Sequence, residues 1–401
     1  MSIIPYGKQT ITNKDISTVV KVLKSDFLTQ GPSVIDFESK FSKYVNSKHS
    51  IAVSNGTAAL HLACIALGVK KGTNVITTSL TFSATANCVK YLGGTVWFVD
   101  IDPKTYLIDL KKVNELINSK PKDFFSGIIP VHFAGRPVNM EKLSRITLKN
   151  KMWIIEDACH APGAYFYDRN SKKQKIGNSK YSDFTIFSFH PVKHLTTGEG
   201  GMLTTNDFLF YQKVLKLRSH GIERNSDNFI NSSETAIGED NFLLNNAYPS
   251  WYMELQELGY NYRICDMQAA LGSSQLDNAY LNLNKRIRIV KKYDKAFLEN
   301  RNILKFARFE DGHAYHLYII EIKDRLGLYN FLKKKGIYTQ VHYFPVHLMP
   351  YYQNFGNKQG DLPKCEKYYK NCLSLPIYPT LSLKEQKFVI DSINEFYKQN
   401  K

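Results

Sequence analysis

The stretch "SIAVSNGTAALHLACIALGV" (residues 50–69) predicts a buried strand, a tight turn and a helix in direct succession. Ser54 or Asn55 is suited to cap that helix. Gly56 lets the backbone approach a ligand closely, and Thr57 places a hydroxyl beside free helix amides. Taken alone, the stretch is compatible with a phosphate-binding helix start and with an ordinary capped turn.

The same order of elements recurs through the first two thirds of the chain. Residues 74–94, "NVITTSLTFSATANCVKYLGG", repeat the pattern of strand, loop and helix. Strands this apolar are typical of a mainly parallel sheet covered by helices on both faces, which is the α/β fold class. Ligands of such sheets bind at the carboxyl ends of the strands. Further strands are predicted for "TVWFVDID" (95–102), "SGIIPVHFAG" (126–135), "KMWIIEDA" (151–158), "DFTIFSFH" (183–190) and "GGMLTTN" (200–206).

The chain of 401 residues is long enough for two or three domains. We predict a large domain over residues 1–264 and a smaller C-terminal α/β domain over residues 265–401, which begins with a long connecting helix. Residues 221–250 are polar and rich in Asn and Ser, so we expect a long loop there. Ser382 and Glu385 have the spacing of a capping box at the start of the last helix.

The formal net charge of +17 has two interpretations. The first is a binder of nucleic acid or of anionic membranes, since such proteins carry an excess of basic residues. The second is a proteome that is generally rich in lysine. The basic residues are scattered, however, and a dense tract such as "NKRIRIVKKY" (284–293) has apolar residues at helical spacing, which indicates a solvated helix face. We therefore expect no nucleic-acid or membrane partner. An anionic small substrate would also suit a basic cleft.

The six cysteines include no CxxC pair, and several lie in apolar segments. This pattern indicates reduced, packed thiols in a cytoplasmic protein, and no metal site is expected. The N-terminal "MSIIPYGKQTITNKD" has no apolar signal core. No segment approaches the roughly 20 apolar residues that span a membrane.

Two ionisable residues follow predicted strands. Asp157 ends the strand in "WIIEDACHAPG" (153–163), where a carboxylate is costly unless it is paired. It can hold a proton on a heteroaromatic nitrogen, or it can form a helix cap or a buried structural pair. Lys193 lies in "SFHPVKHLTTGEGG" (188–201), on a loop defined by Pro191 and by glycines. Partial burial lowers the pKa of a lysine and frees its amine for Schiff-base chemistry, whereas most lysines are exposed.

Four further residues have two interpretations each when taken singly. Phe82 is a core residue or a ring-stacking platform, and His160 is structural or catalytic. Ser188 and Asn261 are phosphate contacts or turn residues. Together the chain offers a phosphate-type helix start, a strand-end carboxylate, a strand-end lysine and an aromatic platform. Pyridoxal phosphate requires these parts, so their co-occurrence predicts a site for that cofactor.

The sequence resembles the fold-type I, pyridoxal-phosphate-dependent sugar aminotransferases of the DegT/DnrJ/EryC1/StrS family. The resemblance extends over nearly the whole chain and implies a large domain with a mainly parallel sheet and a smaller C-terminal α/β domain. It is carried by "TQGPSVIDFE" (29–38), "SNGTAALHLACIALG" (54–68), "TFSATAN" (81–87), "PVHFAG" (130–135), "IEDACHAPGA" (155–164), "SFHPVKHLTTGEGG" (188–201), "LRSHGI" (217–222), "ELGYNYRICDMQAALG" (257–272), "YHLYII" (315–320) and "VHYFPVHLMPYY" (341–352).

The resemblance implies a role for each residue around the cofactor ring. Lys193 is the Schiff-base lysine and the proton carrier of the transamination. Asp157 faces the pyridine nitrogen, His160 lies near the ring hydroxyl, and Phe82 stacks on the ring. Some relatives carry histidine in place of this lysine and act as dehydratases, so the presence of Lys193 implies transamination.

The resemblance also implies how the cofactor phosphate is held. Gly56, Thr57 and Ser188 contact it from the same chain, and Asn261 reaches the phosphate of the neighbouring subunit. The expected assembly is therefore a homodimer with shared active sites.

Within the family, the sequence is most similar to the branch of pseudaminic acid biosynthesis. That branch aminates the C4 ketone of a UDP-linked 4-keto-6-deoxy-N-acetylhexosamine to give UDP-4-amino-4,6-dideoxy-N-acetyl-beta-L-altrosamine, and glutamate is the expected donor. The similarity is carried by "IPYGKQTIT" (4–12), "SDFLTQGP" (25–32) and "WYMELQELGYNYRICDMQAALG" (251–272). Substrate contacts in similar enzymes fall at positions that match Tyr6, Asp26, Phe27, Leu28, Thr29, Tyr315, His316, Leu317 and Tyr318.

The sequence departs from that branch in two motifs, and two alternative functions stay open. "SNGTAAL" (54–60) replaces the "NSATSAL" of that branch, and "HAPGA" (160–164) carries a proline where glycine, leucine or isoleucine is usual. A sister enzyme acting on a GDP- or dTDP-linked 4-keto hexose is the first alternative. A non-catalytic cofactor-binding regulator is the second, although no helix-turn-helix extension is evident in the sequence.

Overall fold

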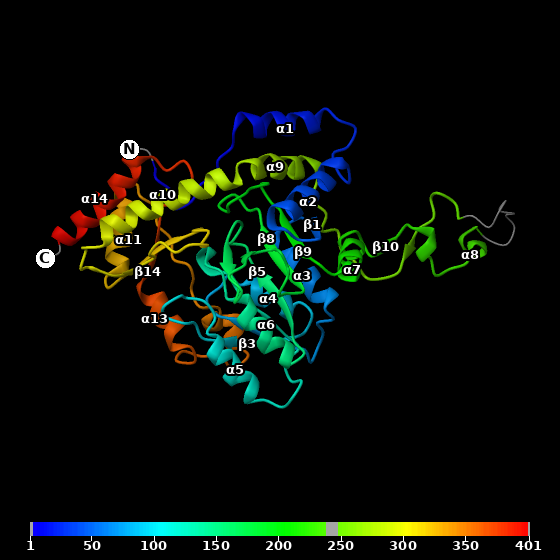
Figure 1. Ribbon diagram of the computed structural model, residues 1–401, viewed down its shortest axis with the longest axis horizontal. Helices are drawn as coiled ribbons and strands as arrows, with labels where there is room; N and C mark the ends of the chain where they lie inside the picture. Colours follow the sequence, from blue (N-terminus) through cyan, green and yellow to red (C-terminus); the bar gives the residue numbers. More distant parts are fainter. Residues whose placement is uncertain (1–2, 238–247, 400–401) are drawn as a thin grey trace.

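The computed structural model describes residues 3–237 and 248–399 of the chain (Figure 1). A large part is built on a seven-stranded sheet, and a smaller C-terminal part is built on a three-stranded sheet. Within the described ranges, none of the helices has the length and apolar character needed to cross a membrane.

The central sheet has the strand order β1, β9, β8, β5, β4, β2, β3. Neighbouring strands run parallel except at β9, which is antiparallel to both β1 and β8. The mainly parallel sheet predicted from the sequence is therefore confirmed. Its strands are β1 (His49–Val53), β2 (Asn74–Thr78), β3 (Thr95–Val99), β4 (Gly127–Ile129), β5 (Trp153–Asp157), β8 (Phe184–Ser188) and β9 (Gly201–Thr205).

Helices cover both faces of this sheet. Ile186 of β8 packs with α3, α4 and α7 on one face, and the next residue, Phe187, packs with α2 and α9 on the other. Because both faces are buried, the strands lack the polar alternation of a half-exposed sheet. The helices around the sheet are α1 (Asn13–Leu23), α2 (Pro32–Val45), α3 (Gly56–Ala66), α4 (Ala84–Lys90), α5 (Leu110–Asn118), α6 (Met140–Lys149), α7 (Phe208–Arg218) and α9 (Asp266–Asp277).

The C-terminal part folds around an antiparallel sheet with the order β12, β13, β14. Buried side chains such as Tyr293, Ile320 and Leu373 form its core. The capping box at the last helix is present, since Ser382 and Glu385 each accept the other's backbone N–H. The elements of this C-terminal part are α10 (Ala279–Phe297), β12 (Ile303–Phe306), β13 (Tyr318–Ile322), α11 (Arg325–Lys334), α12 (Pro350–Gln353), α13 (Pro363–Asn371), β14 (Cys372–Leu375) and α14 (Leu383–Gln399).

Two segments pack against the part of the molecule on the other side of the predicted domain boundary. Helix α9 packs mainly on α1 and α2, so the first helix after residue 264 lies with the large part. Conversely, Ile4 forms a parallel bridge with Ile337 of the C-terminal part, and the Tyr338 N–H donates to the Ile4 carbonyl. This pairing fixes the N-terminal segment that contains Tyr6.

The described residues of the segment predicted as a long loop, 221–237 and 248–250, include short elements and extend away from the body of the molecule (Figure 1). Strands β10 (Ile222–Glu223) and β11 (Glu254–Leu255) pair antiparallel at its base. Helix α8 (Ser233–Ile237) lies farther out. The Glu254 carboxylate accepts the N–H groups of Ile230 and Asn231, so polar side chains stabilise this segment locally. Residues 238–247 of the predicted loop lie outside the described residues.

Gly201 allows β9 to approach the start of α3. A Cβ atom at this position would lie 2.5 Å from the backbone of Asn55 and 2.8 Å from the Gly56 nitrogen. We predict that Gly201→Ala lowers the free energy of unfolding by about 1–3 kcal/mol through this clash. Gly7→Ala is the control, because its Cβ would meet only Val192 at 3.6 Å, an ordinary contact. Thermal unfolding of both variants tests the prediction, and equal melting temperatures would contradict it.

Candidate active site

A cavity of about 830 Å³ lies where the carboxyl ends of the parallel strands face the C-terminal part. That volume is within the usual range for small-molecule sites. The structure brings to this cavity many residues singled out from the sequence: Tyr6, Gly56, Thr57, Phe82, Asp157, His160, Ser188, Lys193 and His316.

The first turn of α3 forms one end of the cavity. The Asn55 side chain accepts the Ala58 N–H at 2.8 Å and so caps the helix. The N–H groups of Gly56 and Thr57 have no acceptor within the helix because they belong to its first turn. A Cβ atom at Gly56 would lie 3.0 Å from the Cβ of Ser188. The absent side chain therefore leaves backbone amides and a hydroxyl close together, an arrangement suited to phosphate.

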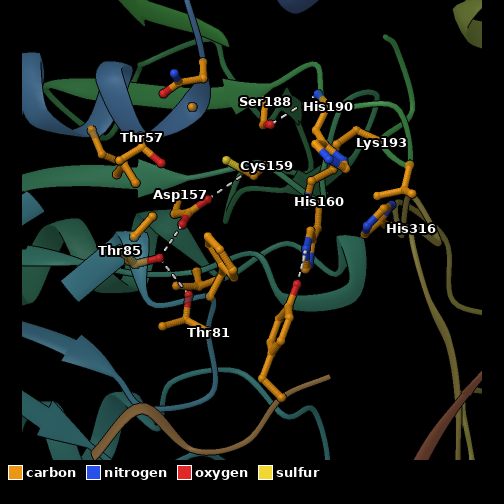
Figure 2. Close-up of a pocket in the computed structure, with 18 of the residues that line it drawn as sticks. Thr57, Thr81, Thr85, Asp157, Cys159, His160, Ser188, His190, Lys193 and His316 are labelled. Carbon is orange, nitrogen blue, oxygen red and sulfur yellow. Dashed lines mark hydrogen bonds between the residues drawn. The ribbon is translucent and has the colours of Figure 1, made fainter. Parts of the chain in front are cut away.

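Asp157 is buried at the end of β5, and its carboxylate faces the cavity (Figure 2). The Thr85 hydroxyl donates to Asp157 Oδ2 at 2.6 Å, and the Cys159 N–H donates to Oδ1 at 3.1 Å. Thr81 extends this chain, because its hydroxyl oxygen lies 2.7 Å from that of Thr85. Among the described residues, no basic side chain forms an ion pair with Asp157. The carboxylate is oriented by neutral donors and can accept a further, charged one.

Lys193 lies on the loop between β8 and β9, beside the cavity. The Lys193 N–H donates to the His190 carbonyl at 2.8 Å, and buried Leu195 anchors the loop. In the part of the chain that the structure describes, Lys193 Nζ has neither a hydrogen bond nor an ion pair. Burial lowers the pKa of Lys193, and the negative charge of the Asp157 carboxylate partly opposes this shift. The amine is thus free to react and more readily neutral than an exposed lysine.

His160 is buried beside Lys193, and both of its ring nitrogens have partners in the protein. The Ala134 N–H points at Nδ1 at 3.3 Å, and the Tyr343 hydroxyl oxygen lies 3.1 Å from Nε2. Burial is the main cause that holds the pKa of His160 well below its usual value, and the nearby positive charge of Lys193 adds to it. The ring is therefore neutral. The family resemblance implies that His160 lies near the cofactor's ring hydroxyl. Because both ring nitrogens already have partners, a hydrogen bond to that hydroxyl would have to replace one of them.

The C-terminal part supplies the opposite wall. The ring of His316 lies 4.3 Å from that of His160, and the ring of Tyr6 lies 5.4 Å from that of His342. Burial and the charge of Lys193 lower the pKa of His342 to about 3, so this imidazole is also neutral. The wall therefore offers neutral hydrogen-bonding groups, with Gln340 beside them.

Several predicted site residues do not line this cavity. Asn261 is exposed and lies in a backbone bridge with Ser219. The segment 26–29, between α1 and α2, is exposed as well. Three residues flanking His316 are buried in the cores instead, and these are Tyr315, Leu317 and Tyr318.

Sequence reasoning did not assign a role to Thr85, Cys159 or Tyr343, which the structure places at the cavity. Thr85 and Tyr343 lie in motifs quoted above, but neither follows an apolar strand, the signal that identified Asp157 and Lys193. Cys159 was grouped with the packed thiols. Burial, with the nearby Asp157 charge, holds its pKa well above the usual value, so the thiol is protonated.

Comparison with known proteins shows which family has this site. The model of the DegT/DnrJ/EryC1/StrS aminotransferase family matches residues 9–394. The chain belongs to this family. It is an aminotransferase, and the fold-type I architecture expected from the sequence is confirmed.

Individual relatives cover almost the whole chain. The UDP-4-amino-4,6-dideoxy-N-acetyl-beta-L-altrosamine transaminase of Campylobacter jejuni is 35% identical over 97% of this chain and 96% of its own length. The GDP-perosamine synthase of Escherichia coli O157:H7 is 31% identical over 99% of both chains. Among solved structures, Spr1654 of Streptococcus pneumoniae in its PLP-form is 27% identical, covers 99% of both chains and has a TM-score of 0.85.

The lowered pKa of Lys193 gives a prediction for the apoprotein. Only the neutral amine reacts with acetic anhydride, so Lys193 should become reactive at lower pH than Lys14, whose pKa is raised by its hydrogen bond and charge interaction with Asp277. Mass spectrometry of tryptic peptides after brief labelling across a pH series measures both midpoints. Because Asp157 supports the charged form of Lys193, Asp157→Asn should lower the Lys193 midpoint further. A Lys193 midpoint at or above that of Lys14 would contradict this account.

Proposed function

We propose that this aminotransferase transfers an amino group from glutamate to the C4 ketone of a UDP-linked 4-keto-6-deoxy-N-acetylhexosamine. The product would be UDP-4-amino-4,6-dideoxy-N-acetyl-beta-L-altrosamine. The observation that carries the chemical part is one cavity holding a free lysine amine and a buried carboxylate without a basic partner. The substrate part rests on the 35% identity to the C. jejuni transaminase.

Pyridoxal phosphate is the cofactor, and the residues present fit it. The amides of Gly56 and Thr57 with the Ser188 hydroxyl suit its phosphate. The Asp157 carboxylate suits a protonated ring nitrogen, which supplies the positive charge that the described residues do not. The amine of Lys193 is free to carry it, and one relative, Spr1654, has been solved in both a PLP-form and a PMP-form.

Each side chain then has a defined task. When bound, pyridoxal phosphate supplies an electron sink that stabilises negative charge developing on the substrate carbon. Asp157, fixed by Thr85, keeps a proton on the ring nitrogen. Lys193 Nζ takes the proton from the α-carbon of the donor and returns one to the acceptor carbon. Phe82 lies at the cavity and is 60% exposed, so its ring is free to cover a flat ligand and exclude water.

We propose a homodimer in which each subunit contributes to both sites. Asn261 and the segment 26–29 are exposed and lie away from the cavity of their own chain, so they are free to act at another subunit's site. Phe27 and Leu28 are 54% and 47% exposed, as expected for side chains that a second copy covers.

We also propose a cytoplasmic location, which the six free cysteines support.

A second substrate class has support of its own. The GDP-perosamine synthase of E. coli O157:H7 matches 99% of the chain, so a GDP-linked 4-keto hexose is the alternative. The identities of 31% and 35% differ too little to decide between the nucleotides.

Covalent fixation of the cofactor tests the chemical part. Borohydride treatment of the yellow holoenzyme should attach the cofactor irreversibly to the peptide that contains Lys193. Lys193→Ala should abolish this attachment, because no other lysine lines the cavity among the described residues. Lys180→Ala is a control lysine variant outside the cavity and should label as the wild type does. Attachment to another residue would refute the assignment.

A panel of nucleotide sugars tests the substrate part. Purified enzyme with glutamate and either the UDP-linked, the GDP-linked or a dTDP-linked 4-keto sugar should aminate the UDP-linked N-acetyl sugar with the highest kcat/KM. Mass spectrometry detects the exchange of oxygen for an amino group. Amination of the GDP-linked sugar alone would refute the UDP proposal and leave the chemical part intact.

A further inference from the structure

The protonation of the buried His160 follows from its two contacts. The backbone N–H of Ala134 points at Nδ1, so Nδ1 must present a lone pair. A neutral imidazole with an unprotonated Nδ1 carries its proton on Nε2. The atom opposite Nε2 is the hydroxyl oxygen of Tyr343, at 3.1 Å. His160 is therefore the donor of this hydrogen bond, and Tyr343 is the acceptor.

The alternative, an imidazolium, is disfavoured from every side of the ring. Burial, followed by the positive charge of Lys193, lowers the pKa of His160. A second proton on Nδ1 would also face the Ala134 N–H directly. The backbone that carries this N–H is held by the neighbouring turn, since the Ala134 carbonyl accepts the His316 N–H at 2.9 Å. One tautomer is thus imposed by the fold.

The hydroxyl proton of Tyr343 therefore has no hydrogen-bond acceptor among the described residues. The oxygen accepts from His160, and the described residues offer it no second hydrogen bond. Two tyrosines of the same region differ in this respect. Tyr368 donates to the His342 carbonyl at 2.8 Å, and Tyr352 donates to Asn87 Oδ1 at 2.7 Å. A donor without an acceptor is costly in an enclosed place, unless a ligand supplies the acceptor.

Tyr343 lies where a ligand can supply that acceptor. It lines the cavity with Phe82 and Asp157, and its ring centre is 6.3 Å from that of Phe82. Burial, followed by the negative charge at Asp157, raises the pKa of Tyr343 far above neutral pH. The hydroxyl therefore remains protonated, so it can donate a hydrogen bond but cannot act as a base.

We propose that Tyr343 is a ligand-binding residue of the active site, whose hydroxyl donates to an oxygen of the bound cofactor or substrate, and that His160 is the positioning residue that directs this proton into the cavity. The acceptor is an oxygen atom: the ring hydroxyl oxygen of pyridoxal phosphate, or a carboxylate oxygen of the glutamate donor. The proposal depends on the family's cofactor and not on which sugar nucleotide is bound.

Tyr343→Phe removes only the hydroxyl and keeps the ring. Its effect is measured in two assays on the full-length protein: the dissociation constant of pyridoxal phosphate from the apoprotein, by absorbance titration, and kcat and KM for glutamate in the first half-reaction. Loss of one hydrogen bond should weaken the affected step roughly threefold to thirtyfold. A weaker cofactor affinity identifies the cofactor as the acceptor. An unchanged cofactor affinity with a raised KM identifies the substrate.

Tyr368→Phe is the matched control, because it removes a buried hydrogen bond to the residue next to Tyr343 without lining the cavity. It should leave both assays at wild-type values. The proposal is overturned if Tyr343→Phe changes neither assay, or if Tyr368→Phe reproduces its effect, which would indicate a merely structural role.

The role of His160 is tested by a double-mutant cycle. His160→Phe should reproduce the loss of affinity seen in Tyr343→Phe. The double variant should lose no more affinity than either single variant, because both substitutions abolish the same hydrogen bond from Tyr343 to the ligand. His160→Gln can accept from Ala134 and donate to Tyr343, so it should restore most of the affinity. Additive losses would overturn the positioning role. If His160→Phe does not fold, the His160→Gln and Tyr343→Phe comparison still decides.

Discussion

The active site depends on a buried carboxylate that the described protein leaves without a basic partner. Asp157 is held by the Thr85 hydroxyl and the Cys159 amide, both neutral donors. A buried charge of this kind is costly unless a cation completes it. We propose that the cofactor's protonated ring nitrogen meets that need, which would make binding favourable where the chain alone is unsatisfied. The same carboxylate partly supports the positive charge of Lys193, which burial opposes.

The sheet topology brings these groups together. Strands β5 and β8 are parallel neighbours, so Asp157 and Ser188 end at the same edge. Because β9 runs antiparallel, the loop that carries Lys193 returns at that edge, and Gly201 lets β9 approach the start of α3. The N-terminal segment and the C-terminal part then close the cavity with Tyr6 and neutral imidazoles. The cavity then holds a buried carboxylate without a basic partner and an amine, and the exposed Glu199 also lies on its lining.

Functional side chains that follow a strand can be predicted from the sequence far better than those contributed by irregular segments of the other part of the molecule. Asp157 and Lys193 follow apolar runs, so the rule for parallel sheets locates both. Tyr343 enters from an irregular segment of the C-terminal part, whose approach depends on packing between distant elements. The same limit applies to the "YHLY" segment, in which only His316 reaches the cavity. A buried Tyr318 and a cavity-lining His316 have no local difference in pattern that separates them.

The central claim is that Lys193 and Asp157 hold opposite ends of one cofactor ring. A high-resolution structure of the holoenzyme tests it most directly. The account predicts continuous density from Lys193 Nζ to the cofactor, the ring nitrogen within hydrogen-bonding distance of the Asp157 carboxylate, and the phosphate at the amides of Gly56 and Thr57. A cofactor bound in another orientation, with its phosphate away from α3 or its nitrogen away from Asp157, would contradict the account.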